Sequence, residues 1–427
     1  MRVLILGANG FIGGRLVARL CAAGHETVLA GRDAAALARR HPSTKTVRAD
    51  LLRDDAAAWA PRLVGVEAVV NAAGVLNGEL DAVHHRGPRA LFDACAAAGI
   101  GRLVQISALG AAPDASTAFL ASKGAADAHL LRLRAEGGRE GWCVLRPALV
   151  LGRGGQSTGL FLTLAALPLP VRLGRGDWAV QPLHVEDLAR AVVALIERRG
   201  AVPPQLDLVG PAPMGTDALT GMLRSWLGLP PRPSLPLPAP LLGLAAQVGA
   251  VLPGATLTPD TLAMLTRGST GDPRPAAEAI GWRARPVAEA LSAEPAVTAD
   301  RWQARLAPLR PLLRGVLAVI WLASGLVPLL VTPGEVSAAL LAGLGLSGAS
   351  ATVVLLAGAL LDVAIGAALL LLPRRTALVG ALGIAVVLGF TLLATIAAPE
   401  LWAHPFAPLL KNAAVIAATL ALMALED

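Results

Sequence analysis

Residues 1–32, MRVLILGANGFIGGRLVARLCAAGHETVLAGR, decide the fold of the N-terminal part of the chain. An apolar run at 3–6 is typical of a buried strand, and apolar residues at helical spacing follow over 11–20. Three glycines lie at the junction between them: Gly7, Gly10 and Gly13. Glycines at this place let the backbone approach a pyrophosphate, whose charge the helix N-terminus stabilises. With a second strand at its end, the stretch predicts a dinucleotide-binding unit of parallel α/β type.

The end of the second predicted strand bears on the choice of cofactor. An acidic side chain there binds the ribose 2′-hydroxyl of NAD, whereas an arginine favours the 2′-phosphate of NADP. The residues present are Gly31, Arg32 and Asp33. We therefore favour NADP(H), with Arg32 as its ligand. NAD(H) is the alternative, which Asp33 supports.

Two further strand ends carry polar or small residues. Asp50 and Leu51 follow a third predicted strand in VRADLLRD, and a fourth, in VEAVVNAAG, ends at Asn71, Ala72, Ala73 and Gly74. In an open parallel sheet, ligands bind outside the carboxyl ends of the strands. The pattern predicts a Rossmann-type, doubly wound parallel sheet with its site at this edge.

Taken together, residues 1–295 resemble the short-chain dehydrogenase/reductase superfamily in its extended and atypical branches. The resemblance implies that the cofactor is bound by the turn residues Gly7, Asn9, Gly10, Phe11, Ile12 and Gly13, by Asp50 and Leu51 at the adenine, by Asn71 to Gly74, by Ser107 in LVQISALGA, by Lys123, and by Arg146 and Pro147 in LRPALVLGRGG. VQPLHVEDLARAVVALIE resembles the motif that begins the substrate lobe, which we expect mainly at 152–175 and 200–295.

The stretch AFLASKGAAD, residues 118–127, departs from the family pattern. In catalytic relatives a tyrosine exchanges the carbonyl proton, and a lysine four residues later lowers the pKa of that tyrosine and binds the nicotinamide ribose. Lys123 matches the lysine, but Phe119 stands at the tyrosine position, and the chain has no tyrosine at all. Lys123 and Ser107 are therefore the catalytic candidates. Other candidate acids are Ser122, Asp81, His84 and His85.

The same departure suggests a rival function. A preserved cofactor turn with ISALGA and no tyrosine before SK resembles atypical members related to the NAD(P)H-binding accessory subunit of respiratory complex I. That resemblance implies tight nucleotide binding without turnover, as in a sensor, scaffold or assembly factor.

The C-terminal part of the sequence is of membrane type. Residues 311–427 hold few charged side chains, and four apolar segments are expected to span a bilayer: 311–331, 351–372, 376–398 and 409–425. A basic juxtamembrane linker, 296–310, precedes them. LLDVAIG and PELWAHPFAPLLKN resemble the DoxX-like family of four-helix membrane proteins, some of which are tied to quinone chemistry.

The arginines predict the orientation of these spans. They gather before the first span and, as Arg374 and Arg375, between the second and third. No signal peptide is visible at the N-terminus. We therefore expect an inner-membrane protein whose nucleotide-binding domain and both termini are cytoplasmic. Asp362, in the middle of a span, marks either a functional site or a packing site.

The amino-acid composition limits the kinds of ligand and partner that we expect. A nucleic-acid partner would need clustered basic residues together with stacking aromatic side chains, and aromatic residues make up only 3% of the chain, which argues against nucleic acid. The three cysteines have no metal-ligand spacing, and we predict no metal site.

The function predicted from the sequence is a membrane-anchored NADP(H)-binding oxidoreductase acting on a lipophilic substrate such as a quinone or a lipid carbonyl. A non-catalytic nucleotide-binding partner of a membrane complex is the alternative. A nucleotide-sugar epimerase or dehydratase is a third class, and it also requires the missing tyrosine.

Overall fold

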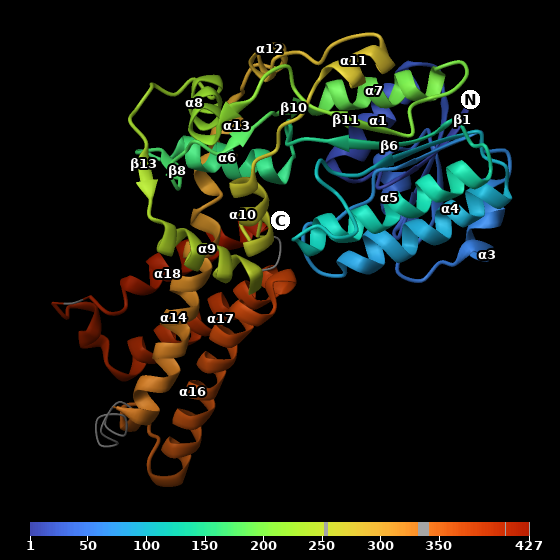
Figure 1. The fold of residues 1–427 in the computed structure, drawn as a ribbon. Coiled ribbons are helices and arrows are strands. Elements are labelled where there is room, and N and C mark those ends of the chain that lie inside the picture. The colour runs from blue at the N-terminus through green and yellow to red at the C-terminus, as the bar shows by residue number, and fades with distance from the viewer. Residues whose placement is uncertain (252–254, 332–340, 406, 427) are drawn as a thin grey trace. The chain divides into compact units, whose positions relative to one another are not determined.

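The computed structural model describes residues 1–251, 255–331, 341–405 and 407–426. The chain divides into two compact units, Met1–Arg301 and Trp302–Asp427, which are described separately (Figure 1).

The first unit is built on a sheet of seven parallel strands in the order β11-β6-β5-β4-β1-β2-β3. These strands are β1 (Arg2–Leu6), β2 (Glu26–Gly31), β3 (Lys45–Arg48), β4 (Ala68–Asn71), β5 (Arg102–Ile106), β6 (Trp142–Pro147) and β11 (Gln205–Leu208). The strand order reverses at β1, which pairs with β2 on one side and with β4 on the other. Such a reversal opens a crevice at the carboxyl ends of the strands, where ligands bind. The predicted doubly wound parallel sheet is confirmed.

Alternating side chains of β1 bury the two faces of this sheet. Val3 and Ile5 pack in one core with α1 (Phe11–Ala22) and α7 (Val185–Glu197). Leu4 and Leu6 pack in the other core with residues of α3 (Ala56–Trp59), α4 (Gly87–Ala97) and α5 (Ala118–Glu136). Figure 1 shows α4 and α5 on one side of the sheet and α1 and α7 on the other. Shorter helices complete the domain: α2 (Ala34–Arg40), a 3-10 turn at Ala60–Leu63, a π-helical turn at Ala82–Arg86 and α11 (Arg274–Ile280).

A smaller lobe follows the sheet and has its own core, which includes Leu151, Phe161, Leu173, Leu219 and Leu223. Its strands form two-stranded pairs: β7 (Val150–Leu151) with β10 (Leu183–His184), β8 (Val171–Leu173) with β13 (Leu235–Leu237), and β9 (Ala179–Val180) with β12 (Met214–Gly215). Its helices are α6 (Gln156–Ala166), α8 (Thr216–Trp226), α9 (Ala239–Val251), α10 (Pro259–Arg267) and α12 (Val287–Ser292), and α13 (Thr298–Leu306) follows.

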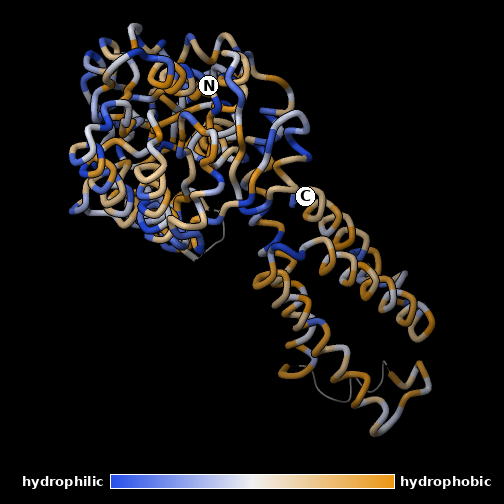
Figure 2. The backbone as a smooth tube through the Cα atoms, turned by 90° about the vertical axis from the view of Figure 1, so that its right-hand side faces the viewer, coloured by the Kyte–Doolittle hydropathy of each residue, from blue (hydrophilic) through white to orange (hydrophobic). Residues whose placement is uncertain are grey.

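The second unit consists of helices, and Figure 2 shows hydrophobic residues along their length. They are α14 (Leu309–Leu330), α16 (Gly348–Leu371), α17 (Thr376–Ala397) and α18 (Lys411–Glu426), with 3-10 turns at Pro373–Arg375 and Pro399–Trp402. Three segments are long and apolar enough to cross a membrane: Thr298–Leu330, Gly348–Leu371 and Pro373–Ala397. The fourth predicted span corresponds to α18, which has 16 residues. That is shorter than the roughly 20 residues that a spanning helix needs. The part of the chain that the structure describes therefore has three candidate spans and not clearly four.

Small residues bring α14 and α16 into backbone contact. A Cβ atom on Gly325 would lie 2.4 Å from the carbonyl oxygen of Ala359, and one on Gly366 would lie 3.0 Å from the backbone nitrogen of Leu322. Asp362 lies on the same face of α16, is 6% exposed, and its Oδ1 atom has no partner in the described residues. Close backbone packing of this kind is typical of helix pairs in membranes.

Candidate functional site

The glycine turn is shaped by contacts that leave no room for side chains. Gly7 has φ +78°, and a Cβ atom on it would lie 2.8 Å from the backbone of Ala72 and Ala73 at the end of β4. A Cβ atom on Gly13 would lie 2.0 Å from the carbonyl oxygen of Gly7. Gly10 is the N-cap of α1, and no side chain caps the helix there. The backbone N–H groups at the start of α1 therefore point out of a narrow turn, which is the donor set that a pyrophosphate requires.

The segment that follows β2 brings one basic side chain, Arg40 of α2, to this turn. Arg32 is exposed. Asp33 caps α2, because its Oδ1 accepts the backbone N–H of Ala36 at 2.8 Å. Arg40, which the sequence analysis missed, donates from Nη1 to the carbonyl oxygen of Asn9 at 3.3 Å. Arg40 is the last residue of α2, nine residues beyond the end of β2, and only the fold brings it to Asn9.

The residues expected at the adenine lie between β3 and α4. The Oδ1 atom of Asp50 accepts the backbone N–H of Leu52 at 3.1 Å. Gly87 starts α4 directly against Leu51, since a Cβ atom on Gly87 would lie 2.4 Å from the carbonyl oxygen of Leu51. These contacts fix the loop after β3 at the sheet edge.

Asn71 organises the end of β4. Its Nδ2 atom donates to Oε1 of Gln105 on the neighbouring strand at 2.7 Å, and its Oδ1 atom accepts the N–H of Ala73 at 3.2 Å. The chain then passes the partly buried Ala72 and Ala73 and reaches Gly74, which is exposed. A Cβ atom on Gly74 would lie 3.4 Å from Nε2 of His84 and 3.6 Å from Nζ of Lys123. The β4 end and α5 therefore meet at Gly74.

Lys123 lies on the face of α5 that is turned toward the sheet. It is 6% exposed, its Nζ atom donates to the carbonyl oxygen of Ile106 at 3.1 Å, and this atom lies 5.6 Å from the centre of the Phe119 ring. Burial lowers the pKa of Lys123 to about 8, and the negative charge of Asp127 opposes that shift. The lysine is thus an ammonium group near neutral pH that loses its proton more easily than an exposed lysine.

His84 connects Phe119 to the loop after Gly74. The ring Nε2 accepts the N–H of Val75 at 3.0 Å, so the proton is assigned to Nδ1, which lies 3.1 Å from Oγ of Ser122. Ser122 in turn donates to the carbonyl oxygen of Phe119 at 3.0 Å. The His84 ring meets the Phe119 ring edge-on at 5.2 Å. Burial, aided by the charge of Lys123, lowers the pKa of His84 to about 3, which keeps the ring neutral.

Ser107 forms part of a buried polar group with two partners. Its Oγ atom donates to Oδ2 of Asp127 at 2.6 Å, and Nε of Arg146 donates to the same oxygen at 3.0 Å. Burial raises the pKa of Asp127, whereas the bond from Ser107 and the charge of Arg146 lower it. The carbonyl oxygen of Pro147 accepts the N–H of Leu109 at 2.9 Å. Sequence reasoning missed Asp127, although its position four residues after Lys123 placed it on the same helix face.

The other candidate acids named from the sequence all take part in hydrogen bonds or ion pairs within the protein. His84, Ser107 and Ser122 use their protons in the hydrogen bonds just described, and exposed Asp81 pairs with His85 at 3.0 Å and with Arg86 at 2.9 Å. Phe119 itself has no proton to exchange. Among the groups that the structure describes around Phe119, Lys123 is left as the one cation with further N–H bonds to offer.

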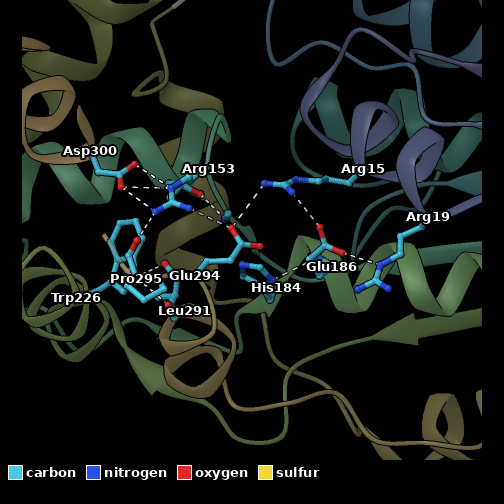
Figure 3. A network of polar contacts seen from close by, with 12 residues as sticks. Arg15, Arg19, Arg153, His184, Glu186, Trp226, Leu291, Glu294, Pro295 and Asp300 are labelled. Atoms are coloured by element: carbon cyan, nitrogen blue, oxygen red, sulfur yellow. Dashed lines mark hydrogen bonds and ion pairs between the residues drawn. The ribbon is translucent and has the colours of Figure 1, made fainter. Parts of the chain in front are cut away.

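Ion pairs tie the start of α7 to α1 (Figure 3). Glu186 binds Arg15 at 3.1 Å and Arg19 at 2.8 Å, both on α1, and His184 accepts the N–H of Glu186 at 3.4 Å. Further along, Arg153 forms an ion pair with Asp300 at 2.9 Å. Arg153 lies in the lobe, between β7 and α6, so this ion pair fastens Asp300, near the end of the first unit, to the lobe.

The sequence comparisons identify both parts of the chain. Residues 3–208 match the NAD dependent epimerase/dehydratase family, and residues 318–420 match the DoxX-like family. A 3-diazoavenalumate denitrifying reductase of Streptomyces sp is 32% identical over 264 residues, which cover 55% of this chain and 84% of the reductase. Subunit 9 of the NADH dehydrogenase [ubiquinone] 1 alpha subcomplex of Arabidopsis thaliana is 27% identical over 52% of this chain and 58% of that protein. An uncharacterised protein of Mycobacterium tuberculosis (strain ATCC 25618 / H37Rv) is 27% identical over 57% of this chain, which spans 25% of that relative's length.

Solved structures share the fold of the first unit. NADPH-dependent quinone oxidoreductase QOR2 of Escherichia coli, complexed with NADPH, has a TM-score of 0.54 at 21% identity, over 68% of this chain and 99% of the other. MoeE5 in complex with UDP-glucose and NAD has a TM-score of 0.53 at 22% identity, over 68% and 96% of the two chains. The chain therefore belongs to the NAD dependent epimerase/dehydratase family, within the short-chain dehydrogenase/reductase superfamily, and carries a DoxX-like domain after its nicotinamide-dinucleotide-binding fold.

Proposed function

We propose that this protein is a membrane-anchored oxidoreductase that binds NADP(H) and reduces a quinone-like lipophilic acceptor. The observation that carries the proposal is the set of side chains on and around α5. Lys123 is present, whereas Phe119 stands in place of the proton donor. The neighbouring donors are used in internal hydrogen bonds.

This arrangement suits an acceptor that does not need a positioned acid. Reduction of an ordinary carbonyl produces an alkoxide, a strong base that requires a proton in the transition state. A quinone that accepts a hydride becomes a phenolate-type anion, which is a much weaker base. The Lys123 ammonium can stabilise that anion electrostatically, and water can supply the proton afterwards. The overall change consumes one NADPH, one quinone and one proton, and yields NADP⁺ and a hydroquinone.

The residues of the turn fit the dinucleotide. The side-chain-free turn at Gly7 and Gly13, and the uncapped start of α1, would hold its pyrophosphate, and Asn71, Gly74 and Lys123 would line its nicotinamide half. When bound, the dinucleotide supplies the hydride. Arg32 is exposed at the end of β2 whereas the Asp33 carboxylate is used as a helix cap, and this favours NADP(H) over NAD(H).

The membrane-spanning helices support a lipophilic acceptor, because they hold the chain where such a substrate dissolves. We propose that the nucleotide-binding unit lies on the cytoplasmic side, in accord with the arginines before α14 and between α16 and α17. The 32% identical reductase supports a reductive activity for the first unit.

A non-catalytic role is the second candidate, and Phe119 is the observation that favours it. A chain that binds NADPH tightly and transfers no hydride would act as a sensor or scaffold for a membrane complex. The similarity to a subunit of NADH dehydrogenase is in keeping with that role.

The choice of acceptor tests the proposal. The full chain is reconstituted in nanodiscs, and NADPH absorbance is followed with a quinone, an aldehyde or a ketone of matched lipophilicity. We expect oxidation with the quinone and little with either carbonyl compound. Tight NADPH binding without oxidation by any of the three would support the scaffold role instead.

A further inference from the structure

A pocket of about 400 Å³ lies in the small lobe, between β8, α8 and the segment that leads into β13. It is lined by residues of the lobe alone: Pro170, Arg172, Asp217, Thr220, Gly221, Arg224, Pro231, Arg232, Pro233 and Ser234. None of these residues belongs to the glycine turn or to α5, so the pocket is separate from the proposed nucleotide site.

The lining of this pocket is basic. Three of the side chains are arginines, and Asp217 is the one carboxylate among them. Arg224 is 5% exposed and stabilises the wall, since its Nε donates to the carbonyl oxygen of Pro230 at 2.7 Å and its Nη1 to that of Leu167 at 3.0 Å. The Nε atom of Arg172 is buried and has no hydrogen-bond partner among the described residues. A buried donor without a hydrogen-bond partner raises the free energy of the folded chain. An anionic ligand bound in the pocket would offset this cost.

Neither Arg172 nor Arg232 forms an ion pair with any residue that the structure describes. Arg232 is exposed, and Ser234, which carries a hydroxyl group, lies in the same lining, whereas the Thr220 hydroxyl donates to the carbonyl oxygen of Thr216 at 2.9 Å. Guanidinium and hydroxyl donors at one concave site are the groups that recognise a phosphate.

The segment that follows the pocket residues in the sequence exposes apolar side chains. Residues 233–259 contain no charged side chain. Within α9, Leu241, Leu244 and Val248 are 53%, 61% and 48% exposed, and their spacing places them on one helix face. Leu242 and Ala246, on the other face, are buried and fix the helix to the lobe. Strand β13, which pairs with β8 so that Pro236 lies opposite Arg172, joins the pocket to this helix.

We propose that the pocket binds the phosphate of an anionic phospholipid while the exposed face of α9 enters the bilayer interface. A bilayer surface offers both complements at once, an apolar zone for Leu241, Leu244 and Val248 and a negative headgroup for Arg172 and Arg232. A soluble phosphate would satisfy the arginines but would leave the apolar face of α9 in water. The site does not depend on the proposed reductase activity.

Hydrogen exchange on the full-length chain in detergent micelles tests this site. The probes are short-chain phosphatidylglycerol, phosphatidylcholine of the same chain length, and inorganic phosphate. The readout is protection of peptides covering residues 231–248, which separates this site from lipid bound by the membrane helices. The variants are Arg232→Gln and Arg172→Gln/Arg232→Gln, with Arg175→Gln as the matched control because Arg175 is 90% exposed and pairs with Asp177.

We expect phosphatidylglycerol to protect the segment in the parent chain and in Arg175→Gln. The apparent affinity should fall about fivefold in Arg232→Gln and about twentyfivefold in the double variant. Arg232→Gln keeps the test valid even where loss of Arg172 disturbs folding, since the Arg232 side chain is exposed. Equal protection in all variants, equal protection by phosphatidylcholine, or protection by inorganic phosphate alone would each overturn the proposal.

Discussion

Lys123 combines burial with a charge that the proposed chemistry uses, and this has a measurable consequence for stability. Its pKa is about 8 in the folded chain against the ordinary value of 10.5. Between these two pH values the unfolded chain binds more protons, so stability should rise as pH increases from 8 to 10.5, by at most roughly 1.4 kcal/mol per pH unit. Below pH 8 the whole cost of burying the charge is present.

The measurement is thermal unfolding of the nucleotide-free chain across this pH range, compared with Lys123→Met. The free energy of unfolding of the parent chain should rise relative to that of Lys123→Met with increasing pH, because the variant has no ammonium group to bury. Two stability curves that stay parallel from pH 8 to 10.5 would show that the folded-state pKa of Lys123 is not lowered.

Phe119 is the residue that sets the type of acceptor in this account. Phe119→Tyr places a hydroxyl four residues before Lys123, on the same helix face, so we expect the variant to gain reduction of ketones or aldehydes by about tenfold or more. Initial rates of NADPH oxidation in nanodiscs measure the gain. Phe119→Tyr/Lys123→Met is the control and should lose it, since the lysine is needed to lower the pKa of the new hydroxyl. No gain with any carbonyl compound would show that the site lacks a productive binding mode.

At the scale of elements, the turn between β1 and α1 should tolerate no side chain at its first glycine. Gly7→Ala combines a φ of +78° with a clash against Ala72 and Ala73, so nucleotide affinity should fall by about tenfold to a hundredfold. Gly14→Ala is the matched control, because its Cβ atom would meet only the carbonyl oxygen of Ala8, at 3.6 Å. Titration of NADPH, followed by fluorescence, compares the two. Equal affinities would place the nucleotide away from this turn.

The elements of the sheet were predictable because the signals are local. The apolar run before Gly7 and the glycine spacing lie within one short stretch, and Asp50 and Asn71 each lie at or just after the end of a strand, β3 and β4. Each of these signals can be read without knowing the rest of the fold. The Asp127 group and the Arg40 contact were not foreseen. Each depends on residues brought together by the fold, since Asp127 meets Ser107 across 20 positions and Arg40 meets Asn9 across 31.

The membrane part shows a similar limit. Hydropathy alone predicts the apolar segments of α14, α16 and α17 well, since each is a continuous run. The fourth segment, predicted at 409–425, corresponds to α18 (Lys411–Glu426), which has 16 residues and is not among the candidate spans. Arg314, in α14, shows what hydropathy leaves out. It lies 3.0 Å from a carboxylate oxygen of Glu426 and donates to Thr376 at 2.6 Å, contacts that only the packed helices provide.

At the scale of the whole molecule, one chain joins a dinucleotide-binding fold to helices that are long and apolar enough to span a membrane. One polypeptide would then bind both a water-soluble electron donor and a lipid-soluble acceptor. Neither molecule would have to leave the phase in which it dissolves. The lipid site proposed in the lobe belongs to the same scale, because it would hold the nucleotide-binding unit at the bilayer surface.

The most direct test of the central claim is NADPH oxidation by the full-length chain in nanodiscs that contain a quinone, measured for the parent chain, Lys123→Met and Lys45→Met. Lys45 is an exposed lysine on β3 and serves as the matched control. The account predicts quinone-dependent oxidation in the parent chain and in Lys45→Met, and a loss of about a hundredfold in Lys123→Met, which removes the charge that stabilises the reduced acceptor. Quinone-dependent oxidation that is unchanged in Lys123→Met, or absent from a parent chain that binds NADPH, would contradict it.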